Sequence, residues 1–360
     1  MMTRATILIC CFMSMGTMVP AEGVDLDRVK EACLRATAYL VSLQWESGCI
    51  QDAAGRLPDS RYDFGTAPRN GLAMSSLAIM ALASVGHLPD DPTPEGEAMK
   101  KALEFVLLDR FQDDLGYFGN ADKSRMYGHG IITLMLAEML GMGVDDTMDR
   151  RIRDKCQAAI DLILRAQVVK KREKDMGGWR YSPNSADSDL SVTVWQVMAL
   201  RAGKNAGLQV PRESIEEAIA YVKRCFIAKH GAFSYEAERE NRVLFSTAAE
   251  GLLSMQVSGR YDAMEVRRSA DYLLKREARP DSQWFYYGMY YYAQGMAQRG
   301  GEHEYTAKER AADLLLALQN VNGSWHGRHG QEREAGKVYA TSMAILSLSV
   351  HFNYLPIYRR

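Results

Sequence analysis

The feature that most constrains this chain is a set of helical segments that carry almost no charge. Glu138 and Glu250 are the only charged side chains in six such segments, at residues 72–83, 131–140, 192–200, 243–253, 285–296 and 338–350. A helix that is apolar on every side is buried all round. The fold must therefore enclose six helices within other protein.

Amphipathic helices alternate with these apolar segments. Residues 100–107 and 150–166, for example, carry charge on one face, which must meet water. Two concentric layers satisfy both helix types most simply, with the apolar helices inside and the amphipathic helices outside. We therefore predict an all-α fold, an α/α toroid of about six helix-pair repeats with an inner barrel wrapped by an outer ring. An open solenoid is the alternative, and it would expose one face of the inner layer.

Glycine and aromatic residues mark the turns between outer and inner helices. The clearest turn is Gly177-Gly178-Trp179, and related turns occur at residues 48–49, 116–118, 231–233 and 323–325. We expect Trp179 and Trp325 to stack on the preceding helix and to fasten the two layers together. The long insertions at residues 51–70 and 170–189 are expected to cover one mouth of the barrel.

The chain ends and the charge balance limit the partners. The 44 basic and 45 acidic residues give a formal charge of -1, which disfavours nucleic acid and anionic membranes as partners. Arg4, an uncharged stretch and Val19-Pro20-Ala21 are typical of a signal peptide over residues 1–21. The stretch is shorter than a membrane-spanning helix. We expect export to the periplasm or beyond, and a mature chain of one toroid domain at residues 22–360.

The cysteines and the short motifs indicate no cofactor. Four cysteines follow the predicted signal peptide, namely Cys33, Cys49, Cys156 and Cys225. They form no C-x-x-C pair, and we expect buried apolar side chains rather than disulfides. The sequence also contains no G-x-S-x-G, H-E-x-x-H or P-loop motif.

At this point the chain resembles known repeat proteins. The Gly177–Tyr181 turn followed by residues 187–196 is similar to the repeats of squalene cyclases and protein prenyltransferase β subunits, and Gln319–Trp325 resembles their Gln/Trp motif. Segments 126–130, 339–341 and 354–357 extend the likeness to exported bacterial proteins with prenyltransferase and squalene oxidase repeats. The resemblance implies an α/α toroid, which agrees with the ring inferred from the helices.

The resemblance also implies candidate catalytic acids. Squalene cyclases protonate an alkene with an Asp-x-Asp-Asp motif, and this chain has Asp187-Ser188-Asp189-Leu190, in which the last acid is replaced. Asp187 and Asp189 are therefore the candidate catalytic residues. Both precede an inner helix, so capping of free N–H groups explains them equally well.

A zinc site does not carry over. Prenyltransferases bind zinc with Asp, Cys and His, and the corresponding positions here hold Asp187, Asp189 and Ala340. We expect no metal, and we argue against a zinc prenyltransferase.

The inner helices of a toroid begin at the same mouth, which would bring a set of aromatic and polar residues together. The candidate ligand-binding residues are Tyr127, His129, Trp195, Tyr286, Tyr287, Tyr290 and Tyr339. For His129, a hydrogen bond across the ring is the structural alternative. Glu138 and Glu250 are expected to pair with arginines of the neighbouring layer.

The sequence thus predicts a cyclase-like toroid that binds an apolar or amphipathic, isoprenoid-like small molecule, with acid chemistry at Asp187 and Asp189. A non-catalytic scaffold that binds a peptide or a glycan is the alternative. Glycan cleavage needs paired carboxylates at the mouth, and Asp187 and Asp189 alone do not supply that pair. The sequence leaves open whether the protein is an enzyme.

Overall fold

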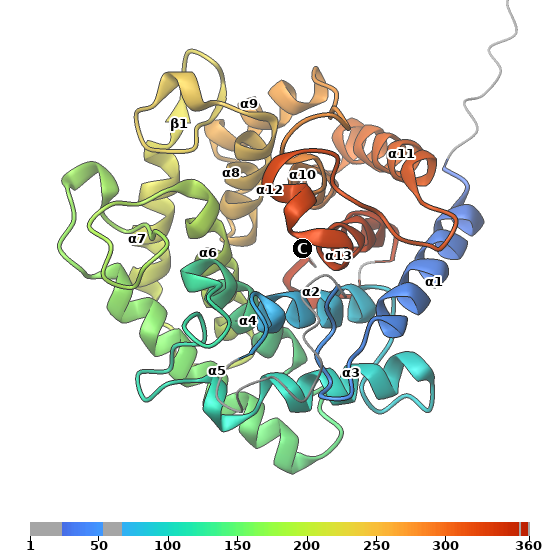
Figure 1. The fold of residues 1–360 in the computed structure, drawn as a ribbon. Coiled ribbons are helices and arrows are strands. Elements are labelled where there is room, and N and C mark those ends of the chain that lie inside the picture. Colours follow the sequence, from blue (N-terminus) through green and yellow to red (C-terminus); the bar gives the residue numbers. More distant parts are fainter. Residues whose placement is uncertain (1–23, 53–66, 353, 359–360) are drawn as a thin grey trace, which may run out of the picture.

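The inner layer is a closed barrel of six parallel helices. The structure is a computed structural model, and it describes residues 24–52, 67–352 and 354–358. The inner helices are α2 (Gly71–Ser84), α4 (Arg125–Met139), α6 (Leu190–Asn205), α8 (Phe245–Val257), α10 (Phe285–Arg299) and α13 (Gly336–Leu348). Each contacts the next, and α13 contacts α2, so the ring closes (Figure 1).

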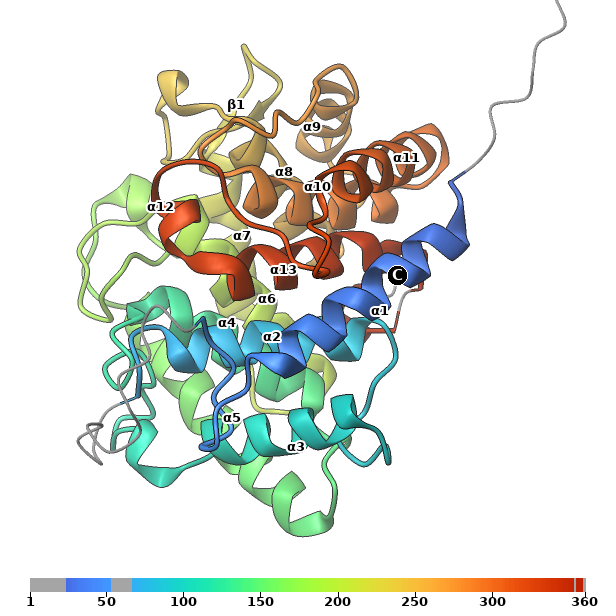
Figure 2. The same ribbon diagram turned by 45° about the vertical axis from the view of Figure 1, so that its right-hand side comes forward.

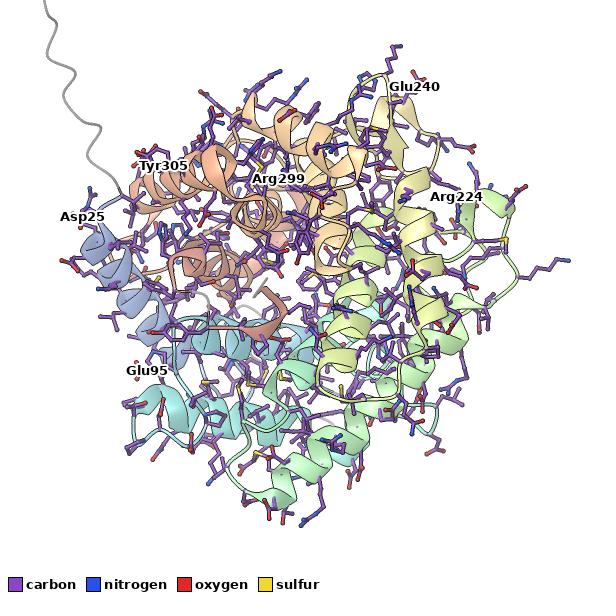
Figure 3. All side chains as sticks on the ribbon, turned by 180° about the vertical axis from the view of Figure 1, so that it is seen from behind. Asp25, Glu95, Arg224, Glu240, Arg299 and Tyr305 are labelled. Carbon is purple, nitrogen blue, oxygen red and sulfur yellow. The ribbon has the colours of Figure 1, made fainter. Side chains whose placement is uncertain are left out.

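The outer layer wraps this barrel. Its helices are α1 (Leu26–Ser42), α3 (Pro94–Val106), α5 (Asp146–Gln167), α7 (Arg212–Arg224), α9 (Met264–Leu274) and α11 (Gly301–Leu318). Helix α1 contacts α13 and α2 (Figure 2). The labelled side chains of Asp25, Glu95 and Glu240 lie at the periphery of the molecule (Figure 3). The predicted α/α toroid is therefore confirmed.

Burial follows the charge pattern of the sequence. Every residue of α2 is buried, whereas α5 buries only one face. Cys33, Cys49, Cys156 and Cys225 are all buried free thiols, as expected. No helix among the described residues is long and apolar enough to cross a membrane. The predicted signal peptide lies outside the described residues.

Short elements complete the ring. Strands β1 (Phe226–Ile227) and β2 (Ala232–Phe233) pair antiparallel, and α12 (Gly330–Glu334) precedes α13. Single 3₁₀ turns occur as η3 (Asp109–Phe111), η4 (Glu173–Asp175), η5 (Glu240–Arg242), η6 (Ser349–His351) and η7 (Pro356–Tyr358).

The last described residues cover the end of the barrel where the inner helices finish. Ile357 donates its N–H to Glu138 Oε2 at 3.1 Å, near the C-terminal end of α4. Tyr354 packs against Gly86, just beyond α2, and η7 contacts α6. A backbone amide near the chain's C-terminus is thus one partner of Glu138, and its pairing with an arginine stays a prediction.

One glutamine contact recurs around the ring. Gln44, Gln112, Gln167 and Gln319 each donate Nε2–H bonds to the carbonyl of a turn glycine at 3.0–3.1 Å and to a carbonyl of the next outer helix at 2.8 Å. We call this pair of bonds the glutamine bracket. The bracket of Gln319 reaches Ala32 in α1, so the last repeat is joined to the first.

The turn glycines are required by backbone geometry. Gly48, Gly116, Gly177 and Gly323 have φ between 82° and 92°, a region that favours glycine. A Cβ at Gly116 would lie 2.2 Å from the carbonyl oxygen of Ala158 on the next outer helix. Each turn therefore lies directly against the backbone of the following repeat.

The tryptophans fasten the layers as expected. Trp179 and Trp325 donate their indole N–H groups to carbonyls of the preceding outer helices, at 2.9 and 2.8 Å. Their backbone N–H groups donate to Thr193 Oγ1 and Thr341 Oγ1 on the inner helices, both at 3.0 Å. One residue thus bonds to both layers.

We predict that Gln319→Ala lowers the free energy of unfolding by about 2 kcal/mol, because it removes both bonds of a bracket. Urea denaturation is the measurement. Gln209→Ala is the control, because the Gln209 side chain is exposed, and it should change the value by less than about 0.5 kcal/mol. Equal effects of the two substitutions would show that the bracket does not stabilise the ring.

Candidate functional site

A cavity of about 1360 Å³ opens where the inner helices begin. All six inner helices, or the residues just before them, contribute to its wall. Tyr181 and residues 67, 69 and 70 also line it, so the described parts of the two long insertions lie at this mouth, as expected. Its aromatic wall consists of Tyr127, Tyr181, Tyr235, Phe245, Trp284, Tyr287 and Tyr339.

Carboxylates from neighbouring segments cap four of the inner helices. Asp122 accepts the N–H groups of Leu72 and Ala73 in α2, both at 3.1 Å. Asp189 caps α6, Glu332 caps α10 and Asp52 bonds to Val338 of α13. These acids satisfy free N–H groups and meet the positive ends of the helix dipoles. Among the described residues, α4 and α8 have no such carboxylate.

Asp189 lies behind the cavity wall rather than in it. Its carboxylate is fully buried and accepts bonds from Val192 N at 2.8 Å and from Tyr235 OH at 3.1 Å. Burial raises the pKa of Asp189, while the Val192 amide and the Arg180 guanidinium, 3.3 Å away, oppose that rise. Asp187 is half-exposed and lies 3.5 Å from Arg180. The geometry of Asp189 is thus that of a helix cap with a route to the cavity through Tyr235.

Tyr235 connects Asp189 to the mouth. Its hydroxyl lies 2.9 Å from that of Tyr181, and both tyrosines line the cavity. The Arg242 guanidinium lies over the Tyr235 ring, 4.5 Å from the ring centroid. Neither tyrosine was among the predicted site residues, although Tyr181 belongs to the insertion expected at the mouth.

His129 faces the outer layer. Its Nδ1 accepts the N–H of Phe118 at 3.4 Å, and its Nε2 lies 3.1 Å from the carbonyl of Ala159 in α5. Thr193 and Thr341 receive turn N–H groups in the same way in other repeats. Burial lowers the pKa of His129 to about 4, so it is neutral. His129 thus forms hydrogen bonds within the protein, which is the structural role given above as the alternative to ligand binding.

The predicted aromatic residues divide into two groups. Tyr127, Tyr287 and Tyr339 line the cavity. Trp195 and Tyr290 lie outside the described lining, stacked with their centroids 5.9 Å apart, and Tyr286 contacts Phe285. Among the other candidates, the described lining includes none of His129, Asp187 and Asp189.

Glu250 is the one carboxylate that lines the cavity in the described part of the chain. It is 1% exposed, its Oε2 has no hydrogen-bond partner, and no described cation pairs with it. The expectation of an arginine partner was wrong for Glu250, because the groups around it are the walls of an aromatic cavity. Burial raises its pKa well above 4.5, the Asp189 charge adds to this, and the Tyr287 hydroxyl opposes it. Burial therefore favours the protonated, uncharged form of Glu250.

Three tyrosines share the electrostatic environment of Glu250. Burial, with a smaller contribution from Glu250, raises the pKa of Tyr127, Tyr287 and Tyr339. Each phenol therefore keeps its proton and presents an uncharged π face. The arrangement can donate a proton inside an aromatic chamber. Among the described residues, no group of three His, Cys, Asp or Glu side chains could hold a metal ion.

The fold and cavity define an α/α toroid, and solved structures with this architecture resemble it. The α-1,6-mannanase GH76A of Salegentibacter sp. HEL1_6 has a TM-score of 0.61 and 9% identity, covering 89% of this chain and 98% of its own. The type II terpene cyclase MstE from Scytonema has a TM-score of 0.58 and 15% identity, covering 91% and 100%.

These two toroids bind different ligands. Inactive mannanase variants were solved with α-1,6-mannotriose and α-1,6-mannotetrose, and MstE variants with geranylgeranyl dihydroxybenzoate. At such low identity the likeness shows the fold alone. No protein-family model and no curated protein match the chain.

We predict that Glu250→Gln raises the free energy of unfolding at pH 8 and leaves it unchanged near pH 4. Between the ordinary glutamate pKa and the raised native value, only the unfolded chain ionises. The wild type therefore loses stability as pH rises, by about 1.4 kcal/mol per pH unit. The variant's amide does not ionise and carries no such penalty. Urea denaturation at pH 4.5, 6 and 8 measures the difference in free energy of unfolding between the variant and the wild type. A difference that grows toward acidic pH would contradict a protonated Glu250.

Proposed function

We propose that the cavity binds an amphipathic, isoprenoid-like ligand and that Glu250 is the acid that acts on it. The observation that carries this proposal is a buried carboxyl group with an unbonded oxygen in an aromatic cavity. An unpaired buried carboxyl group is unfavourable for stability, so its presence favours a functional role.

The chemistry is protonation of a carbon–carbon double bond. The Glu250 proton passes to one alkene carbon, and the positive charge that forms on the other carbon is stabilised by the π faces of Tyr127, Tyr287 and Tyr339. Loss of a proton from a neighbouring carbon back to the carboxylate restores the acid. The product is an isomer of the ligand, so no oxidant or cofactor enters the balance.

Asp189 is a positioning residue in this proposal. Its carboxylate accepts the proton of the Tyr235 hydroxyl, which leaves that hydroxyl to accept from Tyr181, and its charge helps to keep Glu250 protonated. Asp189, one of the two acids expected from the sequence, would thus act through Tyr235 and Glu250 rather than on the ligand directly. This role makes Asp189 a second target for substitution.

A glycan is the second candidate ligand. Asn70, Asn120, Ser246, Gln283 and Gln331 line the cavity and could bond to sugar hydroxyls, and Trp284 could stack on a sugar ring. Hydrolysis of a glycosidic bond generally requires two carboxylates about 5–9.5 Å apart. The described part of the cavity lining offers Glu250 alone, which favours the first proposal.

We predict that Glu250→Gln lowers product formation at least about 100-fold, because a general acid contributes about 10²- to 10⁴-fold. The purified protein is incubated with an isoprenoid lipid extract, and products are separated by gas chromatography with mass spectrometry. Glu138→Gln is the matched control, since Glu138 is the other glutamate of the inner helices and lies at the far end of α4. It should keep full activity.

Two results would overturn the assignment. Full activity of Glu250→Gln together with loss of activity in Asp189→Asn would transfer the acid role to Asp189. Binding of α-1,6-mannotriose in place of the lipid would favour the glycan.

We also propose that the protein is exported, on the strength of the sequence pattern at residues 1–21. The mature protein, isolated from its own host and sequenced from its N-terminus, is expected to begin at Glu22. An N-terminus at Met1 or Met2 would contradict cleavage.

A further inference from the structure

Four cations line the mouth of the cavity. Arg69, Lys123, Arg125 and Arg242 are exposed, and none of them forms an ion pair within the described residues. Burial favours the uncharged form of Glu250, the only described acid of the lining. The rim of an otherwise nearly neutral chain therefore carries a local excess of positive charge.

The backbone at this rim is unusual. Asn70, Lys123 and Arg125 have φ of 59°, 61° and 60°, and they are three of the four non-glycine residues with positive φ in the described chain. Such conformations are unfavourable for lysine and arginine, and they cluster at functional sites. Asp122 helps to hold this segment, because it accepts the N–H of Ser124 at 3.0 Å as well as those of α2.

The positive ends of two inner-helix dipoles add to the positive potential at the rim. Carboxylates cap α2, α6, α10 and α13, but among the described residues none caps α4 or α8. Lys123 and Arg125 lie at the start of α4, and Arg242 lies just before α8. Cations thus occur at the starts of two inner helices whose first turns no described carboxylate caps, an arrangement that favours a bound anion.

Below this rim the cavity becomes apolar and aromatic. Ala73, Met74, Ile131 and Tyr339 line it further along the inner helices. Glu250 lies five residues into α8 from Phe245, which is about 8 Å along the helix axis at 1.5 Å per residue. Glu250 thus lies further along α8 than the end of that helix at the charged rim.

We propose that the ligand carries an anionic end group, a phosphate or a carboxylate, held by Arg69, Lys123, Arg125 and Arg242, with its apolar part extending inward to Glu250. This inference rests on the proposed function and narrows its substrate class from amphipathic molecules in general to anionic amphiphiles. Arginine forks and lysine ammonium groups both match oxyanions. Proton transfer then occurs inward of the charged end, beside Glu250.

Binding of matched lipids tests this assignment. Farnesyl phosphate and farnesol differ only in the anionic group, and farnesoic acid supplies the carboxylate in its place. Their dissociation constants are measured by calorimetry on the full chain, for the wild type, for Lys123→Gln/Arg125→Gln and for the control Lys100→Gln/Arg267→Gln. The control removes the same charge from exposed positions on α3 and α9.

We expect the rim variant to bind farnesyl phosphate at least about tenfold more weakly, with farnesol binding unchanged and with no effect of the control pair. Added salt should weaken only the anionic ligands. A preference for farnesyl phosphate or for farnesoic acid identifies the end group, and either result supports the rim.

Two other results separate the inference from the proposed function. Equal affinity of the wild type for farnesyl phosphate, farnesoic acid and farnesol would overturn the anionic end group and leave the amphiphile site intact. No binding of any of the three would overturn the amphiphile site itself. An equal loss in the rim and control variants would show that net charge, not the rim, attracts the ligand.

Discussion

The ring depends on a side-chain amide that holds two backbones at once. Each glutamine bracket joins a turn to the next outer helix, and the glycine in that turn lets the two backbones touch. The bond from Gln319 to Ala32 connects the first and last outer helices, which no sequence-local contact could do. At these four junctions the bracket fixes one repeat relative to the next, and it thereby contributes to the diameter of the barrel and the room inside it.

That geometry creates the mouth. All six inner helices begin at the same end, so their free N–H groups gather there and require acceptors. Carboxylates supply these acceptors at four helices, and Asp189 is the carboxylate at α6. An acid at such a position resembles a catalytic residue in sequence, since both roles place Asp just before an inner helix. The structure separates them by what each carboxylate contacts: Asp189 bonds to its own helix, and Glu250 meets the cavity.

Much of the fold could be predicted because charge is a strong guide to burial. The uncharged segments became α2, α4, α6, α8, α10 and α13, with boundaries shifted by up to six residues. The site was harder, because a helix such as α10 has tyrosines on all sides and the sequence does not tell which face meets the cavity. The sequence singles out Glu250 as a charge in an apolar helix, but whether an arginine faces it depends on the packing of other helices. The short helix α12 and the cations of the rim lie outside the six uncharged segments, where the sequence has no clear periodicity.

The segment at residues 354–358 gives the barrel a floor. Ile357 bonds to Glu138, and Leu355 and Ile357 are buried over the ends of the inner helices. The described lining of the cavity comes from the mouth and the first turns of the inner helices, so a ligand would enter and leave at the mouth. An amphiphile would travel in with its hydrocarbon end leading and back out with its charged end leading. Release then requires breaking the contacts with the cations of the rim, and the strength of those contacts would set the turnover rate.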